Sequence, residues 1–244
     1  MSGHPLAQAQ AQRPPNPTPE ARPIASLDLF RDLPPGAMED VVSSARVRFI
    51  PRGTCIFDQG EPVERAHALL AGSVRISQAG SDGEQVVIRF IGAGEIFGSV
   101  AIYTDGRYPA DAVAMTDAIE VSWSHDELIA LMERHSRIAI NMVAIVGRRL
   151  GELQDRVREL ATQRAERRIA NTLLRLARQA GQVTTAGQEI GFPLRRKDIA
   201  DISGTTLYTA SRILTQWGRN GWVISGSQHL TLCAPAEIER LAEE

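Results

Sequence analysis

The chain has 244 residues, a formal net charge of −2 and 43% hydrophobic residues, which is enough for two modest domains with apolar cores. No apolar run approaches the roughly 20 residues that span a bilayer, and the N-terminus has no apolar signal core, so we predict a soluble, cytoplasmic protein without membrane contact. The two cysteines, Cys55 and Cys233, are too few and too far apart for a disulfide framework or a cysteine-rich cluster.

The charge is distributed unevenly along the chain. Residues 20–130 contain 17 acidic residues against 9 arginines, whereas residues 164–219 contain 10 basic residues against 4 acidic ones. A basic module joined to an acidic body is expected when only one end of a protein meets nucleic acid. We therefore predict a nucleic-acid-binding module in the C-terminal third.

The N-terminal half begins with a biased segment and continues into a pattern of strands. Residues 1–23 are rich in Ala, Gln and Pro and predict a disordered tail, while residues 24–45 predict helices with a break at Pro34-Pro35-Gly36. Beyond residue 46, short apolar runs such as VRFIP, HALLAGSVRIS and EQVVIRF alternate with glycine-containing turns. Such short, regularly spaced strands predict a small antiparallel β-roll or jelly-roll barrel, so we assign residues 24–125 to a roll domain.

Residues 126–162 return to helical periodicity and are predicted to form one long helix. Apolar residues recur in it at alternating spacings of four and three, namely Ala139, Val143, Val146, Leu150, Leu153, Val157 and Leu160. This spacing is a heptad a/d seam, which joins two parallel helices and predicts a twofold homodimer. The alternative is a long helix that packs on its own roll.

Residues 163–244 predict a winged helix-turn-helix. The segment RRKDIADISGTTLYTASRILTQW, residues 195–217, contains two short amphipathic helices separated by a turn at Ser203-Gly204-Thr205. Gly204 allows a tight turn, and Thr205 or Thr206 can cap the second helix. A helix over residues 164–179 is expected to pack behind this pair, and residues 221–233 predict a two-stranded wing.

The outward face of the second helix is predicted to enter the major groove of DNA. Arg212 is the candidate for a base edge, whereas the basic run at residues 195–197 is better suited to phosphates. The full set of candidate DNA contacts is Arg195, Arg196, Lys197, Thr205, Thr206, Leu207, Tyr208, Thr209, Ser211 and Arg212. A twofold protein with this surface predicts palindromic double-stranded DNA as its partner.

The order of roll, long helix and winged helix-turn-helix resembles the CRP/FNR family of bacterial transcription regulators. The motifs that carry the resemblance are PRGTCIFDQGEP, AGSVRI, GAGEIFG and YPADAVA in the roll and RRKDIADISGTTLYTASRIL in the C-terminal module. The segment TTLYTASRILTQW is also similar to the nitric-oxide-responsive NnrR and DNR branches. The resemblance implies an α+β fold with a cyclic-nucleotide-binding-like jelly roll that senses an effector, a dimerisation helix, and RNA polymerase as a partner.

Two effectors found in this family are disfavoured by departures from its motifs. A cAMP-binding roll uses an Arg-Ser or Arg-Thr pair to fix the cyclic phosphate, but Tyr108-Pro109 stand at that place and Arg107 is one position out of register. The iron–sulfur members need a set of N-terminal cysteines, and the tail contains none. We therefore predict neither cAMP nor an iron–sulfur cluster.

Similarity to the nitric-oxide-responsive branches implies haem as a sensing cofactor. Haem is largely apolar and would fit an apolar roll cavity beside the long helix. The residues predicted to line this cavity are Ile88, Phe90, Ile96, Phe97, Val100 and Met142, and His67 is the first candidate for the axial ligand.

Other function classes are distinguished by what the roll contains. Oxygenases built on such rolls need a His-x-His or two-His-one-carboxylate cluster, but His67 is the only histidine between residues 24 and 124, so we predict that the protein is not an enzyme. A ligand-binding module that regulates a partner protein without touching DNA is opposed by the basic helix-turn-helix. A regulator of this family that needs no effector remains an alternative.

Overall fold

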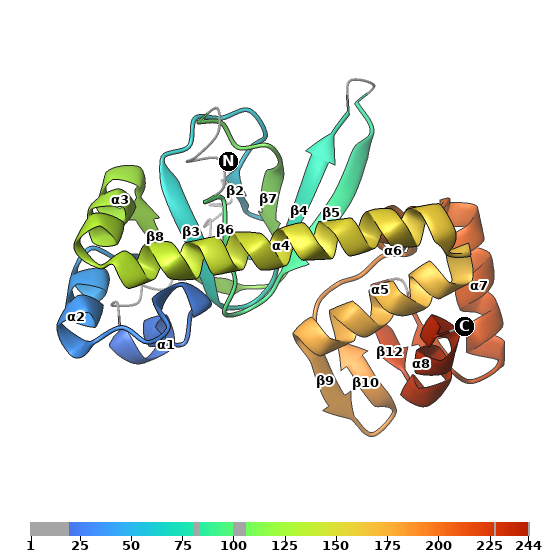
Figure 1. Ribbon diagram of the computed structural model, residues 1–244. Coiled ribbons are helices and arrows are strands. Elements are labelled where there is room, and N and C mark those ends of the chain that lie inside the picture. Colours follow the sequence, from blue (N-terminus) through green and yellow to red (C-terminus); the bar gives the residue numbers. More distant parts are fainter. Residues whose placement is uncertain (1–19, 81–82, 100–105, 227, 244) are drawn as a thin grey trace, which may run out of the picture.

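The computed structural model describes residues 20–80, 83–99, 106–226 and 228–243. It is an α+β molecule in which a β-roll and a C-terminal module are connected by one long helix, α4 (Ser136–Thr162) (Figure 1). The predicted fold class is therefore confirmed. Within the described ranges, the model contains no helix that is both long and apolar enough to cross a membrane.

Among the described residues, the roll consists of two antiparallel four-stranded sheets. One has the order β1 (Arg46–Ile50), β8 (Ala118–Ser124), β3 (Arg65–Ala71), β6 (Ile96–Phe97), and the other has the order β2 (Cys55–Phe57), β7 (Asp111–Ala114), β4 (Val74–Ala79), β5 (Gln85–Ile91). Side chains such as Leu69, Ile91 and Phe57 fill the space between the sheets. The short strands and glycine turns of the sequence thus close into a packed roll, as the spacing predicts.

The N-terminal helices cover one end of the roll. They are α1 (Ala21–Ala25), a 3₁₀ turn η1 (Asp28–Phe30) and α2 (Pro35–Ser43). Phe30 meets Trp123 of β8 edge-on at a centroid distance of 4.8 Å, and Ile24 is fully buried. The predicted tail of residues 1–23 is corrected at its end, because burial of Ile24 anchors a helix that begins at Ala21, while residues 1–19 lie outside the described ranges.

The single helix predicted for residues 126–162 is in fact two helices, α3 (His125–Arg134) and α4. Ser124 and Glu127 form a reciprocal capping box that starts α3 one residue earlier than predicted. The break lies at His135, whose φ of −127° and ψ of 80° are not helical and whose Nε2 lies 2.8 Å from the Asp40 carboxylate. A contact to α2, far away in sequence, therefore interrupts a pattern that looks continuous.

The part of the C-terminal module that the structure describes contains four helices and one sheet. The helices are α5 (Ala165–Ala180), α6 (Arg196–Ser203), α7 (Leu207–Arg219) and α8 (Pro235–Glu243). The sheet has the order β11 (Val223–Ser225), β12 (Leu230–Leu232), β10 (Gly187–Ile190), β9 (Gly181–Thr184). The predicted two-stranded wing is thus half of a four-stranded sheet, because β10 pairs with β12 and brings its hairpin partner β9 with it.

The C-terminal module is docked on the outer face of β5. Val87 and Phe90 of that strand are buried in the same apolar cluster as the module core, and the Phe90 ring lies 4.4 Å from the ring of Phe192. The backbone N–H of Val87 donates to the Asp201 carboxylate of α6 at 3.3 Å. The orientation of the helix-turn-helix is therefore set by its own roll as well as by α4.

Candidate DNA-binding surface and effector cavity

The turn between α6 and α7 has the geometry of a helix-turn-helix. Gly204 ends α6 in the left-handed conformation, with φ of 62°. Thr206 is the N-cap of α7, because its hydroxyl accepts a hydrogen bond from the Thr209 backbone N–H at 3.1 Å. The sequence predicted Thr205 or Thr206 as the cap of the second helix, and Thr206 is the residue that caps it.

The two faces of α7 separate as the periodicity predicts. Its apolar residues Ala210, Ile213, Leu214 and Trp217 are buried in the module core. Leu207 and Tyr208 lie at the N-terminal end and are exposed, with 78% of the tyrosine accessible. Arg212 is exposed on the same helix and has no hydrogen-bond or ion-pair partner in the described part of the chain. The predicted base-reading surface is therefore open and carries one uncommitted guanidinium group.

The basic run that precedes α6 is tied into the module itself. Arg195 pairs at 2.9 Å with Asp198, which is fully buried and also accepts from the Arg195 backbone N–H, and this hydrogen bonding raises the pKa of Arg195. Lys197 pairs with Asp201 at 2.6 Å, a contact that raises the pKa of the lysine. These pairs hold the first turn of α6 in place. Arg195 and Lys197 are also partly exposed, so the phosphate contacts predicted for them would use the exposed parts of their side chains.

Arg196 connects three elements of the module. Its guanidinium group donates to the Thr215 hydroxyl of α7 at 3.2 Å and to the Ser225 hydroxyl of β11 at 3.3 Å. The side chain also lies 3.5 Å from the carbonyl oxygen of Ser211. Arg196 thus connects α7 with the wing strand β11 through hydrogen bonds, a role that the sequence pattern alone does not reveal.

The predicted dimer seam is mostly exposed, and two of its residues, Val146 and Leu153, also border the hollow between the roll, α4 and α5. Six of its residues are exposed along α4, including Val143 at 72% and Leu150 at 56%, while Ala139 is half-buried. The contact of α4 with its own roll uses a different face, formed by Ile138, Met142 and Ile145. Packing of α4 on its own roll therefore occurs, and it leaves the predicted seam on a separate face, where the homodimer stays a prediction. An exposed apolar stripe of this length is typical of a protein–protein contact.

A cavity of about 1200 Å³ lies between the roll, α4 and α5. Five of the predicted lining residues are present in its wall, namely Ile88, Phe90, Ile96, Phe97 and Met142. The sixth, Val100, lies outside the described residues. The prediction of an apolar cavity beside the long helix is therefore consistent with the structure, and the cavity is somewhat larger than the roughly 300–1000 Å³ of ordinary small-molecule sites, so a ligand would fill only part of it.

The cavity also has a charged side that the sequence does not indicate. Its lining includes a set of arginines from the roll, α4 and α5, namely Arg89, Arg148, Arg149, Arg156, Arg158, Arg175 and Arg178. Several of them are paired with acidic residues, such as Arg175 with Glu159 at 2.9 Å. The arginines of α4 flank the heptad seam in the sequence, where they resemble ordinary surface charges. Only the packing of α5 and β5 against α4 turns them toward one cavity.

His67 does not line this cavity, which corrects the prediction. It is buried in the roll core, and its Nδ1 pairs with the Glu120 carboxylate. Its Nε2 lies 3.1 Å from the Tyr108 hydroxyl, and the ring stacks on Phe97 at 5.3 Å. Both ring nitrogens are therefore engaged, and the histidine supports the strand pairing of β3 with β8 instead of pointing at a ligand.

The residues around the cavity fit an iron-bound haem only in part. Among its described lining residues, Met142 is the only one of a type that commonly ligates haem iron, and the lining contains neither His, Cys nor Tyr. The described residues also contain no group of three or more His, Cys, Asp or Glu side chains that could hold a metal ion. The apolar wall suits the macrocycle, but axial ligation would have to come from Met142.

The place of the family's phosphate-binding pair is occupied by a buried aromatic side chain. Tyr108 is buried, its hydroxyl donates to the Arg65 carbonyl at 2.9 Å, and its ring stacks on Phe57 at 3.8 Å. Burial raises the pKa of this tyrosine. Arg107 donates to the Gly60 carbonyl at 2.6 Å. Neither side chain lines the cavity.

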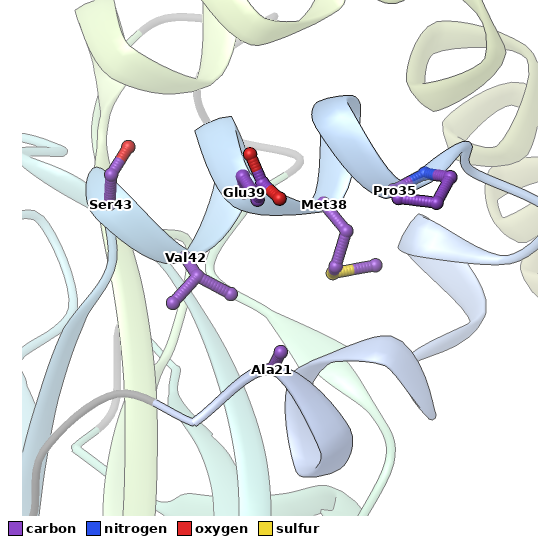
Figure 2. Close-up of a pocket in the computed structure, with 6 residues that line it drawn as sticks. All are labelled: Ala21, Pro35, Met38, Glu39, Val42 and Ser43. Atoms are coloured by element: carbon purple, nitrogen blue, oxygen red, sulfur yellow. The ribbon is translucent and has the colours of Figure 1, made fainter.

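A second, smaller hollow of about 420 Å³ lies at α1 and α2 (Figure 2). It is lined by Ala21, Pro35, Met38, Glu39, Val42 and Ser43. Glu39 is its only charged side chain, so this hollow has no convergent polar groups of the kind that orient a ligand.

Comparisons with known proteins agree with the two-part architecture. Residues 47–135 match the cyclic nucleotide-binding domain, and residues 167–241 match the Crp-like helix-turn-helix domain. The chain is 29% identical to the cyclic AMP receptor protein of Thermus thermophilus, over 88% of this chain and 96% of the relative. It is 24% identical to the CRP-like cAMP-activated global transcriptional regulator of Mycobacterium tuberculosis, over 90% of this chain and 96% of the relative. The solved structure of FixK2 from Bradyrhizobium japonicum matches with a TM-score of 0.69 and 26% identity, over 81% of this chain and 96% of that one.

Proposed function

We propose that the chain is a member of the CRP/FNR family of transcription regulators, and that it is a homodimeric, effector-responsive regulator that reads a palindromic DNA site with α7. The observation that carries the proposal is the exposed face of α7, on which Arg212 is uncommitted while the opposite face is buried. A helix in this position presents its N-terminal half to base edges in the major groove.

Arg212 is proposed to contact a guanine, and Leu207, Tyr208 and Thr209 to shape the rest of the readout. The test begins with selection of a preferred site from random DNA by the wild-type protein. Arg212→Ala is expected to cost about 1–3 kcal/mol on that site and to relax specificity at one position of each half-site. Arg212→Lys is the matched control, because it keeps the charge but loses the bidentate geometry. Equal affinity and equal specificity of wild type and both variants would refute the assignment.

The dimer is proposed to form through the exposed seam of α4. A twofold dimer places two copies of α7 about one helical turn apart, roughly 34 Å, which fixes the spacing of half-site centres. Changing that spacing by half a turn is expected to abolish specific binding, and binding that is indifferent to spacing would contradict the symmetric dimer. We propose RNA polymerase as the protein partner, since the relatives are transcriptional regulators. Transcription in vitro from a promoter with the selected site tests this and shows whether the protein activates or represses.

The cavity between the roll, α4 and α5 is the proposed effector site. cAMP is not expected to bind, because Tyr108 and Arg107 are both committed to contacts within the roll. Haem that senses nitric oxide is the candidate that we propose to test in its place. The apolar wall of the cavity favours haem, and Met142 is the lining residue that could ligate its iron. A haem titration is expected to give a Soret shift that Met142→Leu removes and His67→Ala leaves intact. Absence of stoichiometric haem binding would remove haem and nitric oxide and leave the DNA-binding proposal unchanged.

Two other functions make distinct predictions. A regulator without an effector would bind DNA equally well whatever occupies the cavity. A module that acts only on a partner protein would show no salt-dependent DNA affinity, whereas a protein that contacts several phosphates loses affinity steeply with added salt.

A further inference from the structure

One acidic side chain lies where the roll, α4 and α5 meet. Glu95, just before β6, accepts hydrogen bonds from Arg89 of β5, from Arg149 of α4 at 2.6 Å and from Gln179 of α5. The backbone N–H of Gly92 donates to the same carboxylate at 3.1 Å. We call Glu95, Arg89, Arg149 and Gln179 the Glu95 cluster. It joins three elements that are far apart in the sequence.

The Glu95 cluster connects the cavity with the docked C-terminal module. All four of its side chains line the cavity wall. On the other side, Gln179 also donates to the Phe90 carbonyl at 2.9 Å, next to the packing of Phe90 on Phe192. Loss of the bond between Glu95 and Gln179 would therefore weaken the contact between α5 and β5 that helps to hold the module in place.

The Glu95 cluster itself carries two positive charges against one negative charge. Among the described residues, the further ion-pair partner of its arginines is Glu152, which lies 3.4 Å from Arg149 and is largely exposed to solvent. Burial, and next the neighbouring Arg149, lower the pKa of Arg89 to about 10. Burial of Glu95 opposes ionisation, yet the two arginines hold the pKa of its carboxyl below the ordinary value. An anion in the cavity would therefore meet preorganised positive charge in a partly desolvated site.

We propose that the Glu95 cluster is a latch, and that the ligand of the cavity is an amphipathic anion whose charged group takes Arg89 and Arg149 from Glu95 and so loosens the C-terminal module from β5. The inference rests on the proposed effector site but names the chemistry of the ligand and the route of its action. The apolar wall of Ile88, Ile96 and Phe97 holds the body of the ligand, and the arginines hold its charge. The exchange leaves the Glu95 carboxylate buried without a cation, which is unfavourable, so the carboxylate turns toward solvent and releases Gln179 of α5.

The latch is tested by hydrogen exchange on the full-length protein. Gln179→Leu removes both bonds of this side chain, to Glu95 and to the Phe90 carbonyl, and leaves the ion pairs of Glu95 with the arginines intact. We expect amide exchange to rise several-fold in β5 and α6, whose contact includes the Val87 N–H bond to Asp201, and to remain unchanged in β8 within the roll. Glu95→Gln is the second variant, because it removes the charge without removing the acceptor. An unchanged rate in β5 and α6 in both variants would overturn the latch.

The ligand chemistry is tested with a matched pair of fluorescent probes. 8-Anilinonaphthalene-1-sulfonate has two apolar ring systems and one sulfonate, and N-phenyl-1-naphthylamine is its uncharged counterpart. We expect the sulfonate to bind wild type about tenfold or more tightly than the amine, to lose this advantage in Arg149→Gln, and to raise exchange in β5 and α6 as Gln179→Leu does. Equal binding of both probes, or binding of the sulfonate without faster exchange, would refute the proposal. DNA binding does not enter either measurement, so failure of the latch and failure of the proposed function remain distinguishable.

Discussion

Replacing Gly204 with alanine tests the geometry of the turn that presents α7. Gly204 has a φ of 62°, and a Cβ atom added there would lie 2.2 Å from Cδ2 of Leu160 in the last turns of α4. The left-handed conformation costs a non-glycine residue about 1–2 kcal/mol. Moving one leucine methyl group out of its rotamer adds about 0.5–1.5 kcal/mol. The expected loss of unfolding free energy for Gly204→Ala is therefore about 1.5–3.5 kcal/mol.

The two contributions can be separated with a second background. In Leu160→Ala, the atom that meets the new Cβ is gone, so Gly204→Ala should cost only the backbone part, about 1–2 kcal/mol. The assay is urea unfolding at one fixed protein concentration, because dissociation of a dimer makes apparent stability depend on concentration. Gly204→Asn in the Leu160→Ala background should cost less still, since asparagine tolerates the left-handed region. An equal cost of Gly204→Ala in both backgrounds would show that α4 does not press on the turn, and a cost near zero would refute the left-handed turn itself.

The remaining predictions concern the dimer, the roll core and the effector. Leu150→Glu places two like charges in one apolar layer of the proposed seam, so we expect a monomer in analytical ultracentrifugation and loss of specific DNA binding; a dimer that still binds would contradict the seam. Burial of Glu120 opposes its ionisation, but hydrogen bonds from His67 and Arg48 hold the pKa of its carboxyl below the ordinary 4.5. The contribution of Glu120 to stability is present above pH 4.5 and is lost as the pH falls through the lowered pKa. Glu120→Gln should therefore unfold more easily than wild type at pH 7 but lose less unfolding free energy on acidification. Equal losses of unfolding free energy on acidification in both proteins would refute this. Calorimetric titration with cAMP should give no saturable heat. A stoichiometric isotherm would show that the roll binds cAMP without the Arg-Ser or Arg-Thr pair, and would refute the argument from Tyr108.

Much of the fold follows from local sequence patterns, because the physical causes of those elements are themselves local. The turn of the helix-turn-helix depends on a glycine that can adopt positive φ and on a threonine that caps the next backbone N–H groups, and both signals lie within four residues. The heptad seam is predicted by spacing alone, and its exposure on α4 is what that spacing implies for an isolated chain. The antiparallel roll is likewise predicted by short strands and frequent turns.

Pairings between distant segments could be decided only by the tertiary structure. His67 looked like a candidate ligand because a lone histidine on a strand gives no sign of its partners, and folding places Glu120 and Tyr108 against both of its ring nitrogens. The hairpin of β9 and β10 is too short and too polar to predict, and it becomes a part of the wing only by pairing with β12.

The sequence by itself thus determined the architecture and which face of α7 stays exposed, since helical periodicity, capping and heptad spacing act between residues close in the chain. The tertiary structure decided which arginines share the cavity and how the C-terminal module rests on β5. Arg89 and Arg149 are separated by 60 positions in the sequence, and only the tertiary arrangement of β5 and α4 around Glu95 brings both guanidinium groups to one carboxylate. No local pattern encodes that meeting, because its cause is the burial of apolar surface between whole elements.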